Sequence, residues 1–221
     1  MANNQVLHVD IPTAIGKLEG ILKPEEEHSR PAYVGLVCHL HPLYGGTMHN
    51  KVVFHVARVL QEQNIPALRF NFRGVGHSSG VYDEGRGEMD DTRFALEFLS
   101  RRYPGIPAII AGFSFGAWVG LRVGAVDDRV QALIGLGTPA RLFTDNTLQD
   151  CHKPKLFIHG IEDEQTPYGL TQAWFEHLPA PKRLVTIQGA DHFFKDRLTE
   201  VRDLVVDFVQ SLDRDRAYGT S

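Results

Sequence analysis

The sequence predicts a single α/β domain over residues 1–221, in which a mostly parallel sheet of about eight strands is covered by helices on both faces. From residue 33 onward, short apolar runs alternate with segments whose apolar residues recur at helical spacing. This alternation is typical of a parallel sheet with crossover helices. The first 30 residues instead hold two apolar runs with no helix between them. They predict an antiparallel hairpin at one edge of the sheet.

The predicted strands are short apolar runs bounded by turn residues. They cover residues 6–11, 15–22, 33–39, 66–72, 107–113, 130–136, 155–159 and 183–187. The predicted helices carry apolar residues three or four positions apart, as a half-buried helix requires. They cover residues 49–61, 88–101, 115–126, 168–177 and 196–212. No connection between these elements is longer than about 20 residues, which is too short for a separate cap domain with its own core.

The composition excludes several classes of function. The chain is 43% hydrophobic and 23% charged, and its net charge of −4 excludes the broad positive surface of a nucleic-acid-binding protein. No apolar run approaches the roughly 18 residues of a membrane-spanning helix, and the N-terminus lacks the pattern of a signal peptide. Two cysteines, Cys38 and Cys151, are too few for a disulfide framework. We therefore expect a cytoplasmic protein without nucleic-acid or membrane partners, and the oligomeric state stays open.

The pattern Gly-x-Ser-x-Gly occurs twice, and the surrounding sequence separates the two copies. Ser114 stands between the predicted strand 107–113 and the predicted helix 115–126. A nucleophilic serine needs this sharp strand-to-helix turn, which raises its hydroxyl above the sheet. Ser78, in the other copy, is followed by glycine-rich sequence, and we interpret it as a loop residue. The sequence therefore predicts Ser114 as the nucleophile.

A serine nucleophile needs a histidine as its base and a carboxylate that orients the histidine. His192 follows the last predicted strand, which places it at the carboxyl edge of the sheet, where sites form in α/β folds. Three candidate acids, Glu162, Asp163 and Glu164, follow the strand before it. The chain order of serine, acid and histidine is that of a catalytic triad on a sheet of this kind.

These residues and two further stretches resemble the α/β-hydrolase superfamily, and the resemblance covers nearly the whole chain. The stretches are CHLHPLYGGTMHNKVV at 38–53 and RFNFRGVG at 69–76. Together with GFSFG at 112–116 they look like small, lidless bacterial serine hydrolases that are distantly related to dienelactone hydrolases. In that family the acid is the last residue of an H-G-x-x-D pattern, which implies Asp163. Dienelactone hydrolases use a cysteine nucleophile, so the serine at 114 means that their substrate class is not implied.

Acyl transfer also needs two backbone N–H groups that stabilise the negative charge of the tetrahedral intermediate. Phe115, the residue after the nucleophile, is expected to supply one of them. The other is expected from the loop after the third predicted strand. There the H-G-x-P pattern of the superfamily falls on residues 39–42 and implies His41. Leu43 is the alternative donor, because Pro42 has no N–H.

A metal site is the alternative interpretation of His39 and His41, which lie two residues apart and are followed by two further histidines. No acid or cysteine at ligand spacing accompanies them, so we expect no metal. Cys38 lies in an apolar run and is expected to be a buried, unreactive thiol. We interpret Arg73 as structural, with its guanidinium bound to carbonyl groups of the glycine-rich loop.

The predicted function is hydrolysis of carboxylic esters with short acyl chains, through an acyl-enzyme intermediate on Ser114 and without a cofactor. The expected partner is therefore a small acyl ester or thioester. Without a cap, the site is open to water and buries little of a long acyl chain. Its walls are expected from Leu43, Tyr44, Phe115 and the region of Phe143. A thioesterase or a peptidase could use the same residues, and a non-catalytic binding module is the alternative from another class.

Overall fold

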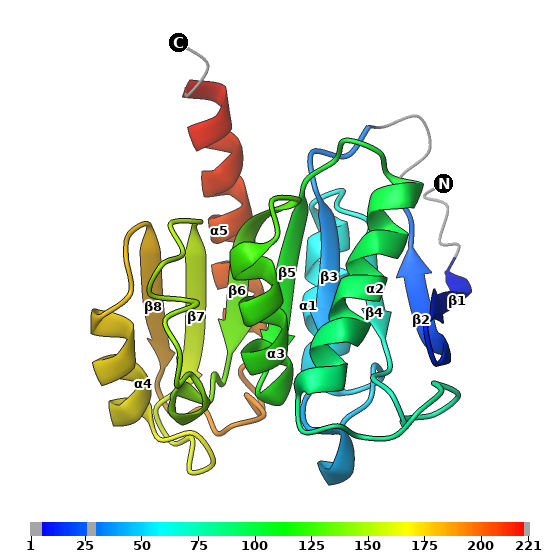
Figure 1. Ribbon diagram of the computed structural model, residues 1–221. Coiled ribbons are helices and arrows are strands. Elements are labelled where there is room, and N and C mark those ends of the chain that lie inside the picture. The colour runs from blue at the N-terminus through cyan, green and yellow to red at the C-terminus, as the bar shows by residue number, and fades with distance from the viewer. Residues whose placement is uncertain (1–5, 26–29, 219–221) are drawn as a thin grey trace.

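The structure is a computed structural model that describes residues 6–25 and 30–218. One sheet runs through it in the order β1-β2-β4-β3-β5-β6-β7-β8, with helices on both faces (Figure 1). The strands are β1 (Leu7–Thr13), β2 (Gly16–Lys23), β3 (Val34–Cys38), β4 (Ala67–Phe70), β5 (Ala108–Phe113), β6 (Val130–Leu136), β7 (Lys155–Gly160) and β8 (Lys182–Ile187). The helices are α1 (Lys51–Glu62), α2 (Arg86–Arg102), α3 (Phe115–Val126), α4 (Tyr168–Glu176) and α5 (Leu198–Tyr218), with short 3-10 helices η1 (Pro42–Tyr44) and η2 (Ala140–Leu142).

The predicted arrangement of the sheet is confirmed. β1 and β2 form an antiparallel hairpin at one edge, and β2 also pairs antiparallel with β4. The strands from β4 across to β8 are parallel to one another, so their carboxyl ends meet at the same edge of the sheet. Residues 1–5, which enter the signal-peptide prediction, lie outside the described residues.

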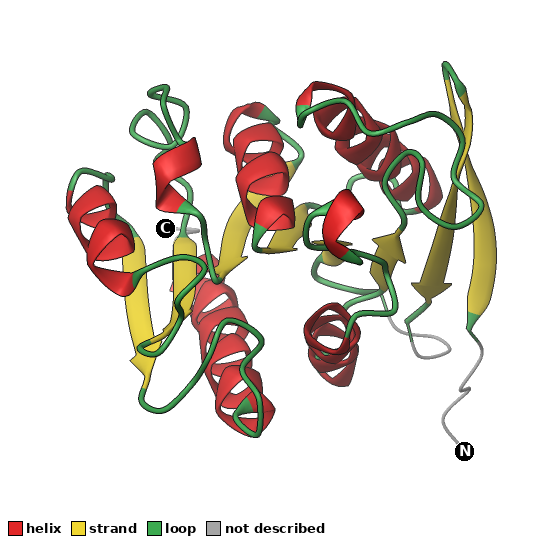
Figure 2. Ribbon diagram, turned by 90° about the horizontal axis from the view of Figure 1, so that it is seen from below, coloured by secondary structure: helices red, strands yellow, loops and turns green. Residues whose placement is uncertain are grey.

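Two apolar cores, one on each face of the sheet, hold the helices in place. On one face, Val56 of α1 and Val205 of α5 are buried with Ile134 of β6. On the other face, Leu96 of α2 and Leu121 of α3 are buried in a core that also receives side chains of α4. Figure 2, which views the molecule from below, shows helices on both sides of the strands. None of the described helices is long and apolar enough to cross a membrane.

The ends of the helices differ by a few residues from the predicted ones, because apolar periodicity alone does not set them. α1 begins at Lys51, since the side chain of Asn50 accepts hydrogen bonds from the N–H groups of Val52 and Val53. α5 continues to Tyr218, beyond the predicted end at residue 212. Its apolar stripe ends earlier, but backbone hydrogen bonds within a helix need no apolar side chains.

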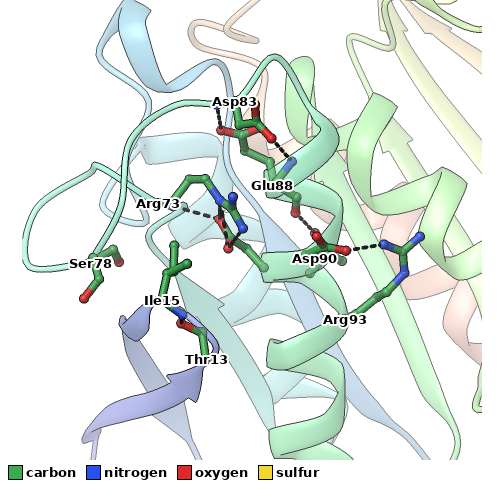
Figure 3. Close-up of polar contacts among 12 residues, drawn as sticks. Thr13, Ile15, Arg73, Ser78, Asp83, Glu88, Asp90 and Arg93 are labelled. Atoms are coloured by element: carbon green, nitrogen blue, oxygen red, sulfur yellow. Dashed lines mark hydrogen bonds and ion pairs between the residues drawn. The ribbon is translucent and has the colours of Figure 1, made fainter.

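A buried ion pair holds the loop that follows β4 (Figure 3). Nη2 of Arg73 lies 2.8 Å from Oδ1 of Asp91 on α2, and the backbone N–H of Arg73 donates to Oδ2 of the same carboxylate at 2.9 Å. The Asp91 side chain is fully buried and the Arg73 side chain is 13% exposed. Arg73 is thus structural, but the prediction of carbonyl partners was wrong. Its partner is 18 residues away in sequence and meets it only when α2 packs on the sheet.

His39 connects the end of β3 to the loop after β4. Its Nε2 accepts a hydrogen bond from the N–H of Phe72 at 3.1 Å, so its Nδ1 carries the proton and donates to the carbonyl of Leu40 at 2.6 Å. Burial lowers the pKa of His39 to about 4, and the bond to the Leu40 carbonyl offsets this only in part. The ring is therefore neutral at pH 7, with both nitrogens engaged. Neither nitrogen is free to bind a metal.

Replacing Arg73 by Met tests the buried ion pair. The variant leaves the Asp91 carboxylate buried without its partner, and we expect a loss of about 3 kcal/mol in the free energy of unfolding, measured with urea at pH 7. The control is Arg93→Met, which removes an ion pair with Asp90 whose two side chains are 50% and 59% exposed. It should cost less than about 1 kcal/mol. Equal losses in the two variants would contradict the role given to Arg73.

The buried neutral ring of His39 predicts a loss of stability in acid. The folded ring takes up a proton only near pH 4, whereas the unfolded ring does so at its ordinary value of 6.5. The contribution of the neutral ring to the free energy of unfolding is complete above pH 6.5. It is lost as the pH falls towards 4, by about 3 kcal/mol in total. Urea unfolding between pH 7 and 4 should therefore show a steeper loss in the wild type than in His39→Gln. Parallel pH profiles would show that His39 is not the group responsible.

Candidate active site

Ser114 occupies a strained turn between β5 and α3. Its backbone has φ 54° and ψ −120°, a conformation that costs a residue with a side chain roughly 1–3 kcal/mol. The N–H of Ser114 donates to the carbonyl of Leu136 on β6 at 2.9 Å, and its own carbonyl accepts from the N–H of Ala117 at 2.9 Å. The serine is partly exposed. This is the strand-turn-helix geometry that the Gly-x-Ser-x-Gly pattern predicts.

Gly116 allows the first turn of α3 to lie against the end of β3. A Cβ atom at this position would come within 2.4 Å of the carbonyl oxygens of both Cys38 and His39. Only glycine fits there, because no Cβ atom tolerates contacts that short with backbone. The close approach brings the N–H of Phe115 next to the loop that begins at Leu40.

His192 and Asp163 are hydrogen-bonded and almost completely buried. Nδ1 of His192 lies 2.7 Å from Oδ2 of Asp163, and each residue is 3% exposed. The carboxylate also accepts from the N–H of Gln165 at 2.9 Å, from the N–H of Thr166 at 2.8 Å and from the Thr166 hydroxyl at 2.6 Å. Burial disfavours the charged carboxylate, but the bonds from His192 and Thr166 outweigh it and hold the pKa of Asp163 below its ordinary value.

The other two candidate acids, Glu162 and Glu164, are exposed. Neither Thr166 nor the role of His159 beside Asp163 was predicted from the sequence. His159 is fully buried, and its Nε2 donates to the carbonyl of Thr166 at 2.6 Å, which fixes the turn that carries the acid. The spacing Asp-x-x-Thr is a pattern in which a side-chain carboxylate bonds to nearby backbone N–H groups, so it could have indicated this turn.

His192 also lies next to the turn that carries the serine. Its ring packs against the ring of Phe113, the residue before Ser114, at 5.0 Å between centroids. The carbonyl of Leu136 accepts the Ser114 N–H. Gly137 follows Leu136, and a Cβ atom at Gly137 would lie 3.0 Å from Cε1 of His192. Because Nδ1 is bound to Asp163, Nε2 is the nitrogen that His192 has available for a hydroxyl.

The loop after β3 distinguishes the two candidate oxyanion donors. The N–H of Leu43 donates to Nδ1 of the His41 side chain at 3.2 Å, so it is already engaged. Within the described residues, the N–H groups of His41 and Phe115 have no hydrogen-bond acceptor. The geometry therefore favours His41 over Leu43 as the partner of Phe115.

Two other nucleophile candidates are occupied elsewhere. The hydroxyl of Ser78 donates to the carbonyl of Asn71 at 2.7 Å and accepts from the N–H of Glu19 at 3.0 Å, so it fastens a loop to β2. The thiol of Cys38 is buried, and burial raises its pKa to about 12 despite a hydrogen bond to Thr92. A thiol in that state is a poor nucleophile.

The residues expected to form the walls of the site are exposed to different degrees. Leu43 and Tyr44 are 66% and 80% exposed, as expected of residues beside an open site. Phe143 itself is buried, with its ring against Trp174 at 4.7 Å between centroids, because the segment after β6 folds back onto α4. The contribution of the residues near Phe143 stays a prediction.

A cavity of about 870 Å³ beside His192, which we call the histidine-side cleft, was not predicted from the sequence. It lies between the start of α1 and the loop that leads into α5. It is lined by Thr47, His49, Asn50, Lys51, Val52, Asp191, Phe193, Phe194, Lys195, Asp196, Leu198 and Thr199. Its volume is typical of sites for small molecules. Another cavity, of about 620 Å³, lies between β2 and α1. Neither cavity is lined by a candidate site residue, but the histidine-side cleft is lined by the two neighbours of His192 in sequence.

Comparisons with known proteins show the family and agree with the fold. Residues 33–143 match the family described as serine aminopeptidase, S33. A crystal structure of an α/β serine hydrolase without a lid from Xanthomonas campestris is 34% identical, covers 94% of this chain and 95% of its own, and has a TM-score of 0.85.

Two further relatives extend the comparison. An uncharacterized protein of Rickettsia prowazekii is 30% identical over 88% of this chain and 84% of its own length. An esterase from Pyrococcus furiosus is 20% identical, covers 94% of this chain and 92% of its own, and has a TM-score of 0.81, which shows a shared fold. The chain thus belongs to the serine aminopeptidase S33 family and has the α/β-hydrolase fold without a lid.

Proposed function

We propose that this serine hydrolase cleaves carboxylic esters with short acyl chains, with Ser114 as nucleophile, His192 as general base and Asp163 as the acid that orients it. The observation that carries the proposal is the buried His192–Asp163 hydrogen bond of 2.7 Å, which lies next to the strained turn at Ser114. A nucleophile, a base and an orienting carboxylate in this relation are the requirements for acyl transfer.

Acylation begins when Oγ of Ser114 attacks the ester carbonyl carbon and its proton passes to Nε2 of His192. The carbonyl oxygen becomes an oxyanion, which the N–H groups of His41 and Phe115 stabilise. Asp163 stays ionised and stabilises the charged imidazole. When the tetrahedral intermediate collapses, the bond to the leaving alcohol breaks and His192 returns its proton to the alcohol oxygen.

Deacylation repeats these steps with water. His192 takes a proton from water, whose oxygen attacks the acyl carbon. The second tetrahedral intermediate expels Ser114, which regains its proton from His192. The products are a carboxylic acid and an alcohol, and the residues of the protein end in their starting state.

The histidine-side cleft is the place where the acyl chain binds in this proposal. It adjoins His192 through Asp191 and Phe193, and its lining includes the exposed ring of Phe193 and the partly exposed side chain of Leu198. Phe193 is 41% exposed and its ring contacts that of His192. A short acyl chain would leave water and contact this apolar surface. Each buried CH₂ contributes up to about 0.8 kcal/mol to the binding free energy.

Cleavage of peptide bonds near an N-terminus is a second candidate, because the family that matches residues 33–143 is described as a serine aminopeptidase. The esterase from Pyrococcus furiosus has the same fold, and this likeness supports the ester proposal over the peptidase. Turnover of p-nitrophenyl butyrate measured beside turnover of aminoacyl p-nitroanilides distinguishes the two. Faster cleavage of the anilides would replace the ester proposal by the peptidase.

Replacing Asp163 by Asn tests the triad. The amide removes the negative charge that supports the imidazolium, and we expect kcat for p-nitrophenyl butyrate to fall by roughly 10³- to 10⁴-fold. The control is Glu162→Gln, at an exposed neighbouring acid, which should leave kcat within about twofold of the wild type. The reverse result would move the acid from Asp163 to Glu162.

A fluorophosphonate probe completes this test, because it labels an activated serine covalently. Labelling should disappear in Ser114→Ala and persist in Ser78→Ala, the serine of the other Gly-x-Ser-x-Gly pattern. An unlabelled wild-type protein that is folded by circular dichroism would instead indicate a non-catalytic binding module.

The length of the acyl chain tests where the substrate lies. In a p-nitrophenyl ester series, kcat/KM should fall beyond about six to eight acyl carbons, because further CH₂ groups stay in water. Thr199→Trp places a large ring at an exposed position of the histidine-side cleft and should lower kcat/KM for the hexanoate about tenfold while sparing the acetate. A maximum at palmitate would contradict the short-chain proposal, and an unchanged hexanoate rate would place the chain elsewhere.

A further inference from the structure

The side chain of His41 is held at both ring nitrogens by two other segments of the protein. Its Nδ1 accepts the N–H of Leu43 at 3.2 Å, and its Nε2 lies 3.1 Å from the hydroxyl of Tyr82. Because Nδ1 accepts, the proton of the neutral ring is on Nε2 and is donated to the Tyr82 oxygen. Burial lowers the pKa of His41 although the nearby Glu88 carboxylate opposes this, so the neutral form predominates at pH 7.

Three aromatic rings surround the same imidazole. The ring of Tyr44 lies 4.6 Å from that of His41, and the rings of Tyr82 and Phe115 each lie 4.9 Å from it. These rings come from the loop after β3, the loop before α2 and the first residue of α3. The His41 ring is thus fixed both by hydrogen bonds and by packing, although the adjacent residues Leu43 and Tyr44 are largely exposed.

Tyr82 itself stands on a rigid base. The backbone N–H groups of Asp83 and Gly85 donate to the two carboxylate oxygens of Glu88, at 2.9 and 2.7 Å. Glu88 is fully buried in the first turn of α2, where a carboxylate is favoured by the helix N-terminus. Figure 3 shows Glu88 reaching back to Asp83, with Arg73 beside it on the neighbouring loop. Asp83 follows Tyr82 directly, so its hydrogen bond to Glu88 holds the backbone next to Tyr82 in place.

We propose that Tyr82 is a positioning residue for the oxyanion site. It fixes the imidazole of His41 and thereby aligns the backbone N–H of His41. The inference rests on the proposed function, in which this N–H stabilises the oxyanion. A donor must lie within about 2.7–3.1 Å of the oxyanion to act, so a small shift of the loop after β3 weakens transition-state binding. Substrate binding in the ground state changes little, because that N–H gains its strength only when the charge develops.

The test is Tyr82→Phe, which keeps the ring and removes the hydroxyl that binds His41. Removing an oxyanion donor outright costs roughly 10²- to 10³-fold in kcat, so a misaligned donor should cost about 5- to 30-fold, with KM within about twofold. The matched control is Tyr103→Phe. Tyr103 follows the last residue of α2, at the far end of this helix from Tyr82, and its hydroxyl donates to the Glu25 carboxylate at 2.7 Å. The variant therefore removes a bonded tyrosine hydroxyl outside the site, and we expect an unchanged kcat.

A second measurement separates positioning from a general loss of structure. An alkyl trifluoromethyl ketone adds to Ser114 and forms a hemiketal oxyanion, so its inhibition constant reports on the oxyanion site directly. In Tyr82→Phe this constant should rise by the same factor as kcat falls. Both kcat and the inhibition constant are measured with enzyme whose concentration of active sites is known from titration. The thermal unfolding midpoint of Tyr82→Phe should match that of the wild type.

The outcomes separate this inference from the proposed function. A wild-type kcat in Tyr82→Phe, or a raised KM at constant kcat, would overturn the positioning role while the triad stands. An equal loss in Tyr103→Phe would also overturn it, since the Tyr82 hydroxyl would then have no special part. Ester hydrolysis that survives in Ser114→Ala would overturn the proposed function and this inference with it.

Discussion

The contact between the first turn of α3 and the carboxyl end of β3 is the constraint on which the candidate site depends. Gly116 lies so close to the carbonyls of Cys38 and His39 that no side chain fits between them. This contact fixes the distance between the strained turn at Ser114 and the loop that begins at Leu40. The N–H of Phe115 is on one side of it and the N–H of His41 is on the other. In the proposed function, these two N–H groups serve one oxyanion because the two backbones meet here.

Three buried carboxylates support the site, and each is stabilised in a different way. Asp91 is paired with Arg73, Glu88 accepts two backbone N–H groups, and Asp163 accepts backbone N–H groups, a hydroxyl and the imidazole of His192. The first two have partners that keep their protons at any moderate pH, so they serve as fixed supports. Asp163 alone of the three binds an imidazole, the group that transfers protons in the proposed function. The need to satisfy a buried charge thus explains both the two fixed supports and the proposed role of Asp163.

The fold and the proposed triad could be predicted from the sequence because their signals are local. Ser114, Asp163 and His192 each follow a strand of the parallel sheet, and the order of strands along the chain already places them at one edge. Contacts between distant segments left no such signal. Nothing near Arg73 in sequence indicates Asp91, and nothing near His41 indicates Tyr82. These pairs, and the cleft between the start of α1 and the loop before α5, depend on how helices and loops pack after the sheet has formed.

The strand order described above also determines where the candidate site lies. In the sheet, β4 lies on one side of β3 and β5 lies on the other. The chain that leaves β3 leads to α1 on one face, and the chain that leaves β5 leads to α3 on the opposite face. Such a topological switch point is where open α/β sheets bind their ligands. His41 follows β3 and Ser114 follows β5, so the two residues flank this point. The switch point is a property of connectivity, so segments such as the one between β6 and β7 can change in length without moving it.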